Sequence, residues 1–236
     1  MIPLHDANPT RNIPIVTRLL LFTNIAIWLY IVYLSRTAGA VEAFYDRWAF
    51  DWSAFIGALS RPWNVDTLQA FIPLFTHQFL HGGWLHVLGN MLYLWIFGDN
   101  VEDNMGSLPF LGFYLLCGAI AAIGQGLVAP SPMVGASGAI AGVLGAYLVL
   151  YPTARVSTLI FLGLFISVID LPAIIVIGFF IVLQILEGVA ELRMTTHAAA
   201  QQVAYFAHLF GFAAGIVLLF VFRQRAAPRR ARVGWG

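Results

Sequence analysis

The chain has 236 residues, of which 60% are hydrophobic and only 10% are charged. A soluble globular domain carries about 25% charged residues, so this composition excludes an ordinary soluble protein and also excludes intrinsic disorder. The net charge of +1 gives no reason to expect nucleic-acid binding, and the single cysteine, Cys117, cannot form an intrachain disulfide. With a mean hydropathy of +0.84, the remaining class is a polytopic membrane protein.

Long uncharged stretches predict six spanning helices, because a span needs about 20 apolar residues. The longest stretch, between Asp103 and Arg155, fits two spans with a turn at Pro130 and Pro132. We therefore expect an all-α polytopic membrane protein built as a six-helix bundle. The predicted spans are 17–35, 83–101, 108–128, 136–151, 172–190 and 203–222.

The segment 156–170 is short for a span, since 14 uncharged residues separate Arg155 from Asp170. We interpret it as interfacial or re-entrant, followed by a helix that starts at Pro172. A seven-helix protein is the main alternative. The first apolar stretch is longer than the roughly 7–15 residues typical of a cleaved signal peptide, so we expect it to be retained.

Arginine placement predicts the orientation, since cytoplasmic loops carry an excess of basic residues. The side that holds both termini has most of the arginines. Residues 1–16 and the Arg-rich tail 223–236, which we expect to contact anionic lipid headgroups, are therefore cytoplasmic, and loop 36–82 is external. The tryptophans of this loop predict amphipathic helices along the membrane surface. We expect a multi-pass protein of the plasma (inner) membrane of a bacterium.

Polar residues inside a bilayer are costly and are therefore candidates for function. Ser137 follows the proline turn within Gly135-Ala136-Ser137-Gly138, in the first turn of a predicted helix. Backbone N–H groups lack helical partners there and can stabilise an oxyanion. The alternative is a helix-packing motif, because Gly138 and Gly142 have the spacing of small residues at helix contacts.

His208 precedes Gly211 and Gly215 by about one and two turns, and this glycine spacing permits close approach of another helix. His208 should therefore point at that helix, where a neutral imidazole could act as general base for a serine. The alternative is a structural histidine bonded to a backbone carbonyl.

His86 and Asn90 are four residues apart and share one helix face. Both are donors suited to holding an oxyanion, and the alternative is interhelical hydrogen bonding. The nearby His77 and His81 precede the span, and we expect them to be structural and bonded to loop backbone.

All four residues lie near the outer ends of three helices that run in the same direction, so we expect them at one shallow external level. Unrelated packing residues have no reason to share a level. The arrangement predicts a nucleophile, Ser137, a base, His208, and an oxyanion clamp. No acid is placed to complete a triad, because Asp170 lies at the opposite end and Glu187 is expected to face a loop.

Four motifs in order resemble the rhomboid intramembrane serine proteases, over roughly residues 75–220. The segment 75–81 with His86-x-x-x-Asn90 is similar to the second-helix signature of that family. The other three are Gly135-Ala136-Ser137-Gly138, Ala207-His208 with Gly211 and Gly215, and Glu102-x-x-x-Gly106-Ser107.

The resemblance implies a membrane domain over 17–222 with a Ser137–His208 dyad in a cavity open to the outside. His86, Asn90 and backbone N–H groups near Ser137 would form the oxyanion hole. Substrates would be transmembrane proteins that approach past the fifth helix, and no metal or organic cofactor would be needed. The oligomeric state and the cleavage preference stay open.

Two departures from the family pattern weaken this reading. Ile72-Pro73 stands where many members carry Trp-Arg, and Ala141 replaces an aromatic residue that stacks on the histidine. A catalytically weak or inactive rhomboid-like protein that binds membrane substrates is therefore the nearest alternative. A transporter or channel is less favoured, because it would place polar groups near the bilayer midplane on paired repeats.

Overall fold

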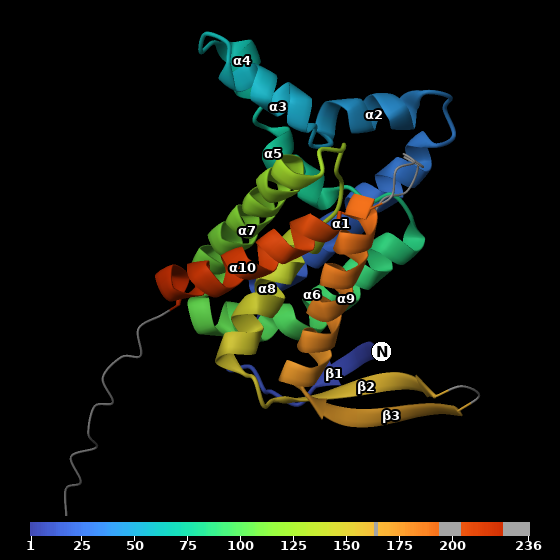
Figure 1. Ribbon diagram of the computed structural model, residues 1–236, viewed down its shortest axis with the longest axis vertical. Coiled ribbons are helices and arrows are strands. Elements are labelled where there is room, and N and C mark those ends of the chain that lie inside the picture. The colour runs from blue at the N-terminus through green and yellow to red at the C-terminus, as the bar shows by residue number, and fades with distance from the viewer. Residues whose placement is uncertain (163–164, 194–203, 224–236) are drawn as a thin grey trace, which may run out of the picture.

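The computed structural model describes residues 1–162, 165–193 and 204–223. Six long helices lie over the six ranges predicted as spans (Figure 1). The Arg-rich tail and residue 203 fall outside the described residues, apart from Arg223. The long helices are α1 (Ile15–Leu34), α6 (Trp84–Met105), α7 (Ser107–Val128), α8 (Ser137–Leu150), α9 (Ala173–Arg193) and α10 (Tyr205–Phe222).

Four of these helices are long and apolar enough to cross a membrane among the described residues: α1, α7, α9 (over Ala173–Ala190) and α10. The helix α6 has 22 residues but carries polar side chains along its length. The helix α8 has only 14 residues, about 21 Å at 1.5 Å per residue, which is shorter than the hydrocarbon core. The fold is thus mostly helical, with four candidate spans.

Loop 36–82 folds into short helices, as its aromatic and apolar runs predicted. Asp51 caps α3 by accepting from the backbone N–H of Ala54, and Asn64 and Thr67 form a capping box on α4. These helices gather at one end of the molecule, away from the N-terminus (Figure 1). They are α2 (Ala40–Trp48), α3 (Trp52–Leu59), α4 (Val65–Gln69), α5 (Pro73–Thr76) and the 3₁₀ turn η1 (His77–Phe79).

The expectation of an all-α protein is wrong at the opposite end of the molecule. Strands β1 (Ile2–Asp6), β2 (Arg155–Leu162) and β3 (Phe165–Pro172) form an antiparallel sheet in the order β1-β2-β3. The β-branched residues of segment 156–170 favour a hairpin, and the N-terminal strand pairs with one edge of it. The seven-helix alternative is therefore also wrong, because this segment is a β-hairpin.

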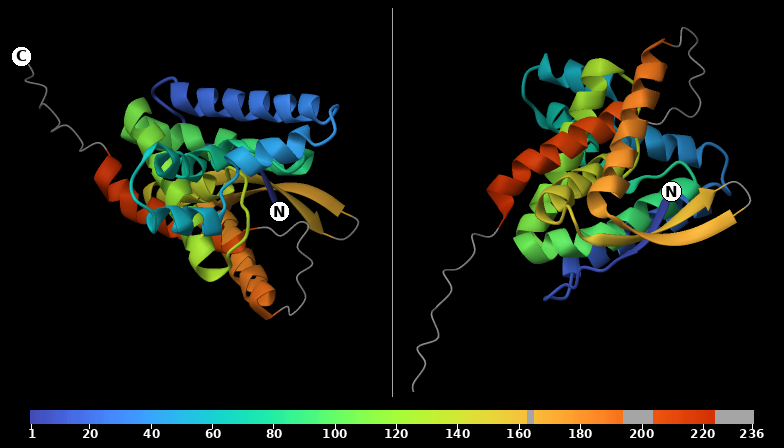
Figure 2. Two further views of the ribbon diagram at one scale, coloured as in Figure 1. Left: turned by 90° about the horizontal axis from the view of Figure 1, so that it is seen from above. Right: turned by 60° about the horizontal axis from the view of Figure 1, so that its bottom comes forward.

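The core centres on α8, in which residues 138–147 are all buried. In the turned views of Figure 2, α1 runs along one side of the bundle, and α9 and α10 lie on the other. Small residues on α8 let the neighbouring helices approach closely enough to bury its backbone. The short helix α8 is thus enclosed, and its first residue, Ser137, is held in place by its surroundings.

Candidate active site

The turn before α8 gives Ser137 its position. Gly135 has φ of +129°, a backbone conformation that residues other than glycine rarely adopt. Its backbone N–H donates to the carbonyl of His77 at 2.9 Å. The hydrogen bond ties the turn to the loop helices. Ser137 is the first residue of α8 and is partly exposed, in contrast to the ten buried residues that follow.

His86 and Ser137 meet above Gly135. A Cβ at Gly135 would lie 2.7 Å from Nε2 of His86 and 3.7 Å from Oγ of Ser137, so the missing side chain leaves room for both groups. The backbone N–H of Gly82 donates to Nδ1 of His86 over 3.5 Å. This bond leaves the proton of a neutral imidazole on Nε2, which then faces Ser137 as a donor.

Glycines on α8 and α10 bring His208 to the same region. A Cβ at Gly211 would collide with the carbonyl of Gly138, and one at Gly215 would collide with the carbonyl of Gly142. The predicted close approach at these glycines is confirmed. A Cβ at Gly138, next to Ser137, would lie 3.7 Å from the carbonyl oxygen of Ala207, next to His208, so the packing motif brings the helix segments that carry these two residues close together.

The helix α9 supplies two contacts to His208 that the sequence analysis did not identify. Nδ1 of His208 lies 2.6 Å from Oε1 of Gln184, and the ring of Phe180 lies 5.9 Å from the imidazole, centroid to centroid. Both His208 and Gln184 are buried. Gln184 is a polar residue within an apolar span, and this signal alone could have marked it as a candidate.

Asn90 presents a donor that nothing satisfies among the described residues. Its Nδ2 is buried and has no hydrogen-bond partner there. The N-cap residue of α8, Ala136, has no side-chain acceptor, and no other described side chain accepts from the N–H groups of its first turn. The region therefore offers several donors to an oxygen that carries negative charge.

His77 and His81 differ from each other. Nδ1 of His77 lies 2.9 Å from the carbonyl of Pro73, which confirms the predicted bond to loop backbone, and burial lowers the pKa of His77 to about 4. The ring nitrogens of His81 are buried without a well-formed hydrogen bond among the described residues, and the loop backbone at Phe79 interacts with the ring. The His81 ring packs edge-on against His86 at 5.0 Å, and burial, with His86 nearby, lowers the pKa of His81 to about 3.

No carboxylate within the described residues makes a hydrogen bond to His208. Asp170 lies on β3 and accepts from the hydroxyl of Ser157 at 2.6 Å, and Glu187 is exposed on α9. No group of three or more His, Cys, Asp or Glu side chains in the described ranges is arranged to hold a metal ion.

Glu102, in the fourth motif, lies at the other end of α6. Its carboxylate accepts from the backbone N–H groups of Val16 and Thr17 at 2.9 and 2.7 Å and from the hydroxyls of Thr17 and Ser107 at 2.8 and 2.6 Å. It is therefore a structural junction between α1, α6 and the start of α7.

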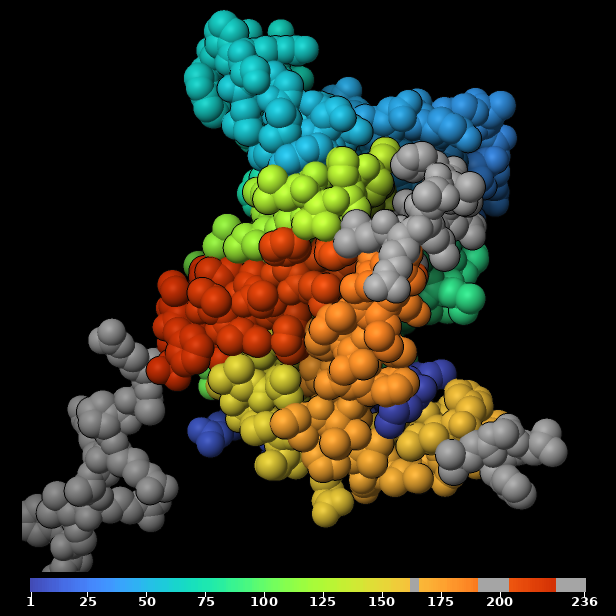
Figure 3. Space-filling view, in the orientation of Figure 1, coloured from blue at the N-terminus to red at the C-terminus, as the bar shows by residue number. Residues whose placement is uncertain are grey.

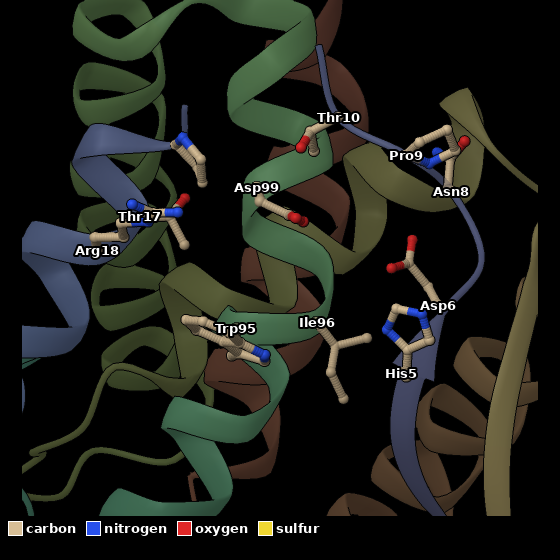
Figure 4. A pocket seen from close by; sticks show the side chains of 11 residues that line it. His5, Asp6, Asn8, Pro9, Thr10, Thr17, Arg18, Trp95, Ile96 and Asp99 are labelled. Atoms are coloured by element: carbon tan, nitrogen blue, oxygen red, sulfur yellow. The ribbon is translucent and has the colours of Figure 1, made fainter. Parts of the chain in front are cut away.

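A cavity of about 320 Å³ lies between β1, α1 and α6, close to the Glu102 end (Figure 4). Asp99, Asp6 and Arg18 line it together with Trp95. The carboxylate of Asp6 already has two hydrogen-bond donors, the hydroxyl of Tyr147 at 2.6 Å and the side-chain amide of Asn100. None of the four predicted site residues lines this cavity.

Comparison with known families agrees with the motifs. Residues 68–225 match the rhomboid domain, which is more than half of the chain. The chain belongs to the rhomboid family. It is thus a multi-pass integral membrane protein, and the matched region contains Ser137, His208, His86 and Asn90.

Several named rhomboid proteins are similar in sequence to segments of this chain. The rhomboid protease GluP of Bacillus subtilis is 45% identical over 75 residues, which cover 32% of this chain and 15% of the relative. Rhomboid-like protein 11, chloroplastic, of Arabidopsis thaliana is 28% identical over 159 residues, 64% of this chain and 52% of that protein. The rhomboid protease GlpG of Haemophilus influenzae is 34% identical over 70 residues, 30% of this chain and 36% of that one. The chain spans about half the length of these relatives or less.

Proposed function

We propose that this rhomboid is an intramembrane serine endopeptidase that cleaves transmembrane segments of membrane-protein substrates. Ser137 is the nucleophile and His208 is the general base. His86, Asn90 and the N–H groups of the first turn of α8 hold the oxyanion. The reaction needs no metal or organic cofactor.

In the first step, Oγ of Ser137 attacks the scissile carbonyl carbon while Nε2 of His208 takes the hydroxyl proton. The carbonyl oxygen becomes an oxyanion and accepts hydrogen bonds from the donors around Gly135. His208 then returns the proton to the leaving amine, and the peptide C–N bond breaks. A water molecule, deprotonated by His208, hydrolyses the acyl-enzyme and restores the serine.

The proposed arrangement in the membrane has six spans over residues 17–222. Two of them, α6 and α8, are not among the four candidate spans, because α6 carries polar side chains and α8 is short. Both termini are cytoplasmic, and loop 36–82 and the site are external, in the plasma membrane of a bacterium. This orientation would put the sheet end at the cytoplasmic face. Water reaches the scissile bond from the external side.

One observation carries the proposal: the Ser137 hydroxyl and Nε2 of His86 share the space above Gly135, at the start of the buried helix α8. The close packing of Gly138 against Ala207 supports the assignment of His208 to the same site. A serine placed only for helix packing would need neither an imidazole donor nor a buried histidine next to it.

The experiment compares Ser137→Ala with Ser131→Ala, a hydroxyl in the preceding turn, on a transmembrane substrate in liposomes. Loss of a nucleophile typically costs on the order of 10⁶ in kcat, so Ser137→Ala should leave no detectable cleavage, with insertion unchanged. Ser131→Ala should cleave at the wild-type rate. Cleavage by Ser137→Ala at that rate would assign the nucleophile elsewhere.

A serine-directed phosphonate gives an independent readout of the same site. It should label Ser137 in the wild type and much more slowly in His208→Ala, because the base accepts the hydroxyl proton. Equal labelling would remove His208 from the mechanism. An unlabelled, uncleaving wild type would favour the weak or inactive substrate-binding protein for which Ala141 argues.

A further inference from the structure

We propose that Gln184 of α9 is a positioning residue that fixes the tautomer and the orientation of His208. The inference rests on the proposed function, and it adds a third member to the Ser137–His208 pair. The chain thereby supplies from α9 the support that Ala141 does not provide from α8.

The hydrogen bond between the two side chains defines the tautomer. The carboxamide oxygen Oε1 of Gln184 can only accept, so Nδ1 of His208, 2.6 Å away, must carry the proton. Nε2 of the neutral imidazole is then unprotonated, which is the form needed to take the proton of Ser137. A carboxylate could do the same, but none among the described residues is bonded to His208.

A second contact from α9 restrains the ring. Phe180 lies one turn before Gln184 on the same helix face, and its ring contacts the imidazole at 5.9 Å. Ala141, one turn after Ser137, is fully buried and has no ring to offer. The hydrogen bond and the ring contact thus come from one helix.

Gln184 differs from the other residues of α9 in its surroundings. It lies on the surface of the bundle beside α10 (Figure 3), and its other faces expose apolar residues such as Val182 and Leu186. Gln184 is buried against His208, in contrast to these neighbours. A buried carboxamide on an otherwise apolar helix is costly unless it is hydrogen-bonded, and His208 is its hydrogen-bond partner here.

The test uses three variants of the full-length protein in liposomes. Gln184→Met keeps the size of the side chain but loses the hydrogen-bond acceptor, Gln184→Glu keeps the acceptor, and Val217→Ala is a control at an exposed position of α10. Gln184→Met should lower kcat by about 10-fold to 100-fold, because a misplaced base is inefficient, and KM should change by less than about twofold. Phosphonate labelling of Ser137 should slow in parallel. Val217→Ala should match the wild type.

Gln184→Glu separates positioning from simple packing. It should restore most of kcat, and it should move the acidic limb of the pH–rate profile to higher pH, since a carboxylate stabilises the imidazolium. Other titratable groups on the elements around His208, namely His86 of α6, Cys117 of α7, Glu187 of α9 and Tyr205 of α10, are the same in all variants. A limb that moves only with residue 184 therefore reports the contact with His208.

The outcomes distinguish two failures. If the wild type neither cleaves nor is labelled, the proposed function fails. If the wild type cleaves and Gln184→Met has the same kcat, the inference alone fails. An inactive but folded Gln184→Glu would also overturn it, because the amide group would then act by donating to Nδ1.

Discussion

The first turns of α1 and α8 both have backbone N–H groups without partners inside the helix, but only those of α1 receive an acceptor from another helix. Neither helix is capped by the side chain of its own N-cap residue. At α1, the carboxylate of Glu102 reaches across from α6 and accepts from the N–H groups of Val16 and Thr17. At α8, no side chain among the described residues accepts from the N–H groups of the first turn.

Under the proposed function, the difference separates a structural helix start at α1 from a catalytic one at α8. A carboxylate at a helix N-terminus satisfies free N–H groups and interacts favourably with the helix dipole. The same physics would stabilise an oxyanion at the start of α8, where a permanent carboxylate would occupy the position required by the reaction. Removing Glu102 should therefore affect stability, whereas changes around α8 should affect turnover.

The largest effect is expected for Glu102→Ala, which leaves two backbone N–H groups and two hydroxyls without their acceptor. Each buried donor left unpaired in this way typically costs about 1–3 kcal/mol of unfolding free energy. Activity per folded molecule should stay within about twofold, because Asn90 lies roughly 18 Å away along α6. Denaturant unfolding and active-site titration measure the two quantities.

Asp103→Ala is the matched control, since this neighbouring carboxylate accepts from the exposed N-terminal segment at Arg11 and Asn12. It should cost clearly less stability. Equal losses for the two variants would show that Glu102 has no special role in closing α1.

At the other end of α6, Asn90→Ala and His86→Ala should each lower kcat by about 10²–10³, the usual cost of one oxyanion donor. Asn90 lies one turn deeper than His86, but helical side chains lean toward the N-terminus, so both can reach the level of Ser137. Stability should be unchanged or slightly higher for Asn90→Ala, whose buried Nδ2 is unsatisfied.

The measurement is kcat for each variant beside Ser137→Ala under identical conditions. Wild-type turnover in both would assign these residues to packing alone. The oxyanion would then depend on the backbone N–H groups of α8.

The smallest effect is a pH dependence of stability that arises at His77, whose carbonyl accepts a hydrogen bond from the N–H of Gly135. Burial lowers its pKa from 6.5 to about 4 in the folded protein, so the unfolded chain binds the proton first as the pH falls. Stability is fully present above 6.5 and is lost between 6.5 and about 4, by an amount of up to about 3 kcal/mol. His77→Asn, which keeps a donor for Pro73, should flatten this slope. An unfolding midpoint with the same pH dependence in both proteins would contradict the assignment.

Hydrophobic length and proline position were sufficient to locate the long helices. The turn at Pro130 and Pro132 separates α7 from α8, and helices lie over all six predicted ranges. The strands of segment 156–170 were not predicted, because an apolar, β-branched stretch has the same composition in a membrane segment and in a strand. Its pairing partner, β1, is distant in the sequence, and composition carries no information about it.

The candidate site was only partly accessible from the sequence. Ser137, His208, His86 and Asn90 were singled out because polar groups are rare in spans. Gln184 carries the same signal and was missed, and its contact with His208 is seen only in the packed structure. The same limit applies to His81, whose ring packs on His86, a contact that the sequence analysis did not predict.

The sequence by itself determined the class of protein, the long helices and the motifs of the rhomboid family, since these depend on composition and local spacing. Only the tertiary structure decided which N–H groups are satisfied, which glycines face each other and what holds His208. These properties depend on contacts between residues far apart in the chain, such as Gln184 with His208 and Glu102 with Thr17. A contact of that kind forms when helices pack, and no local pattern specifies it.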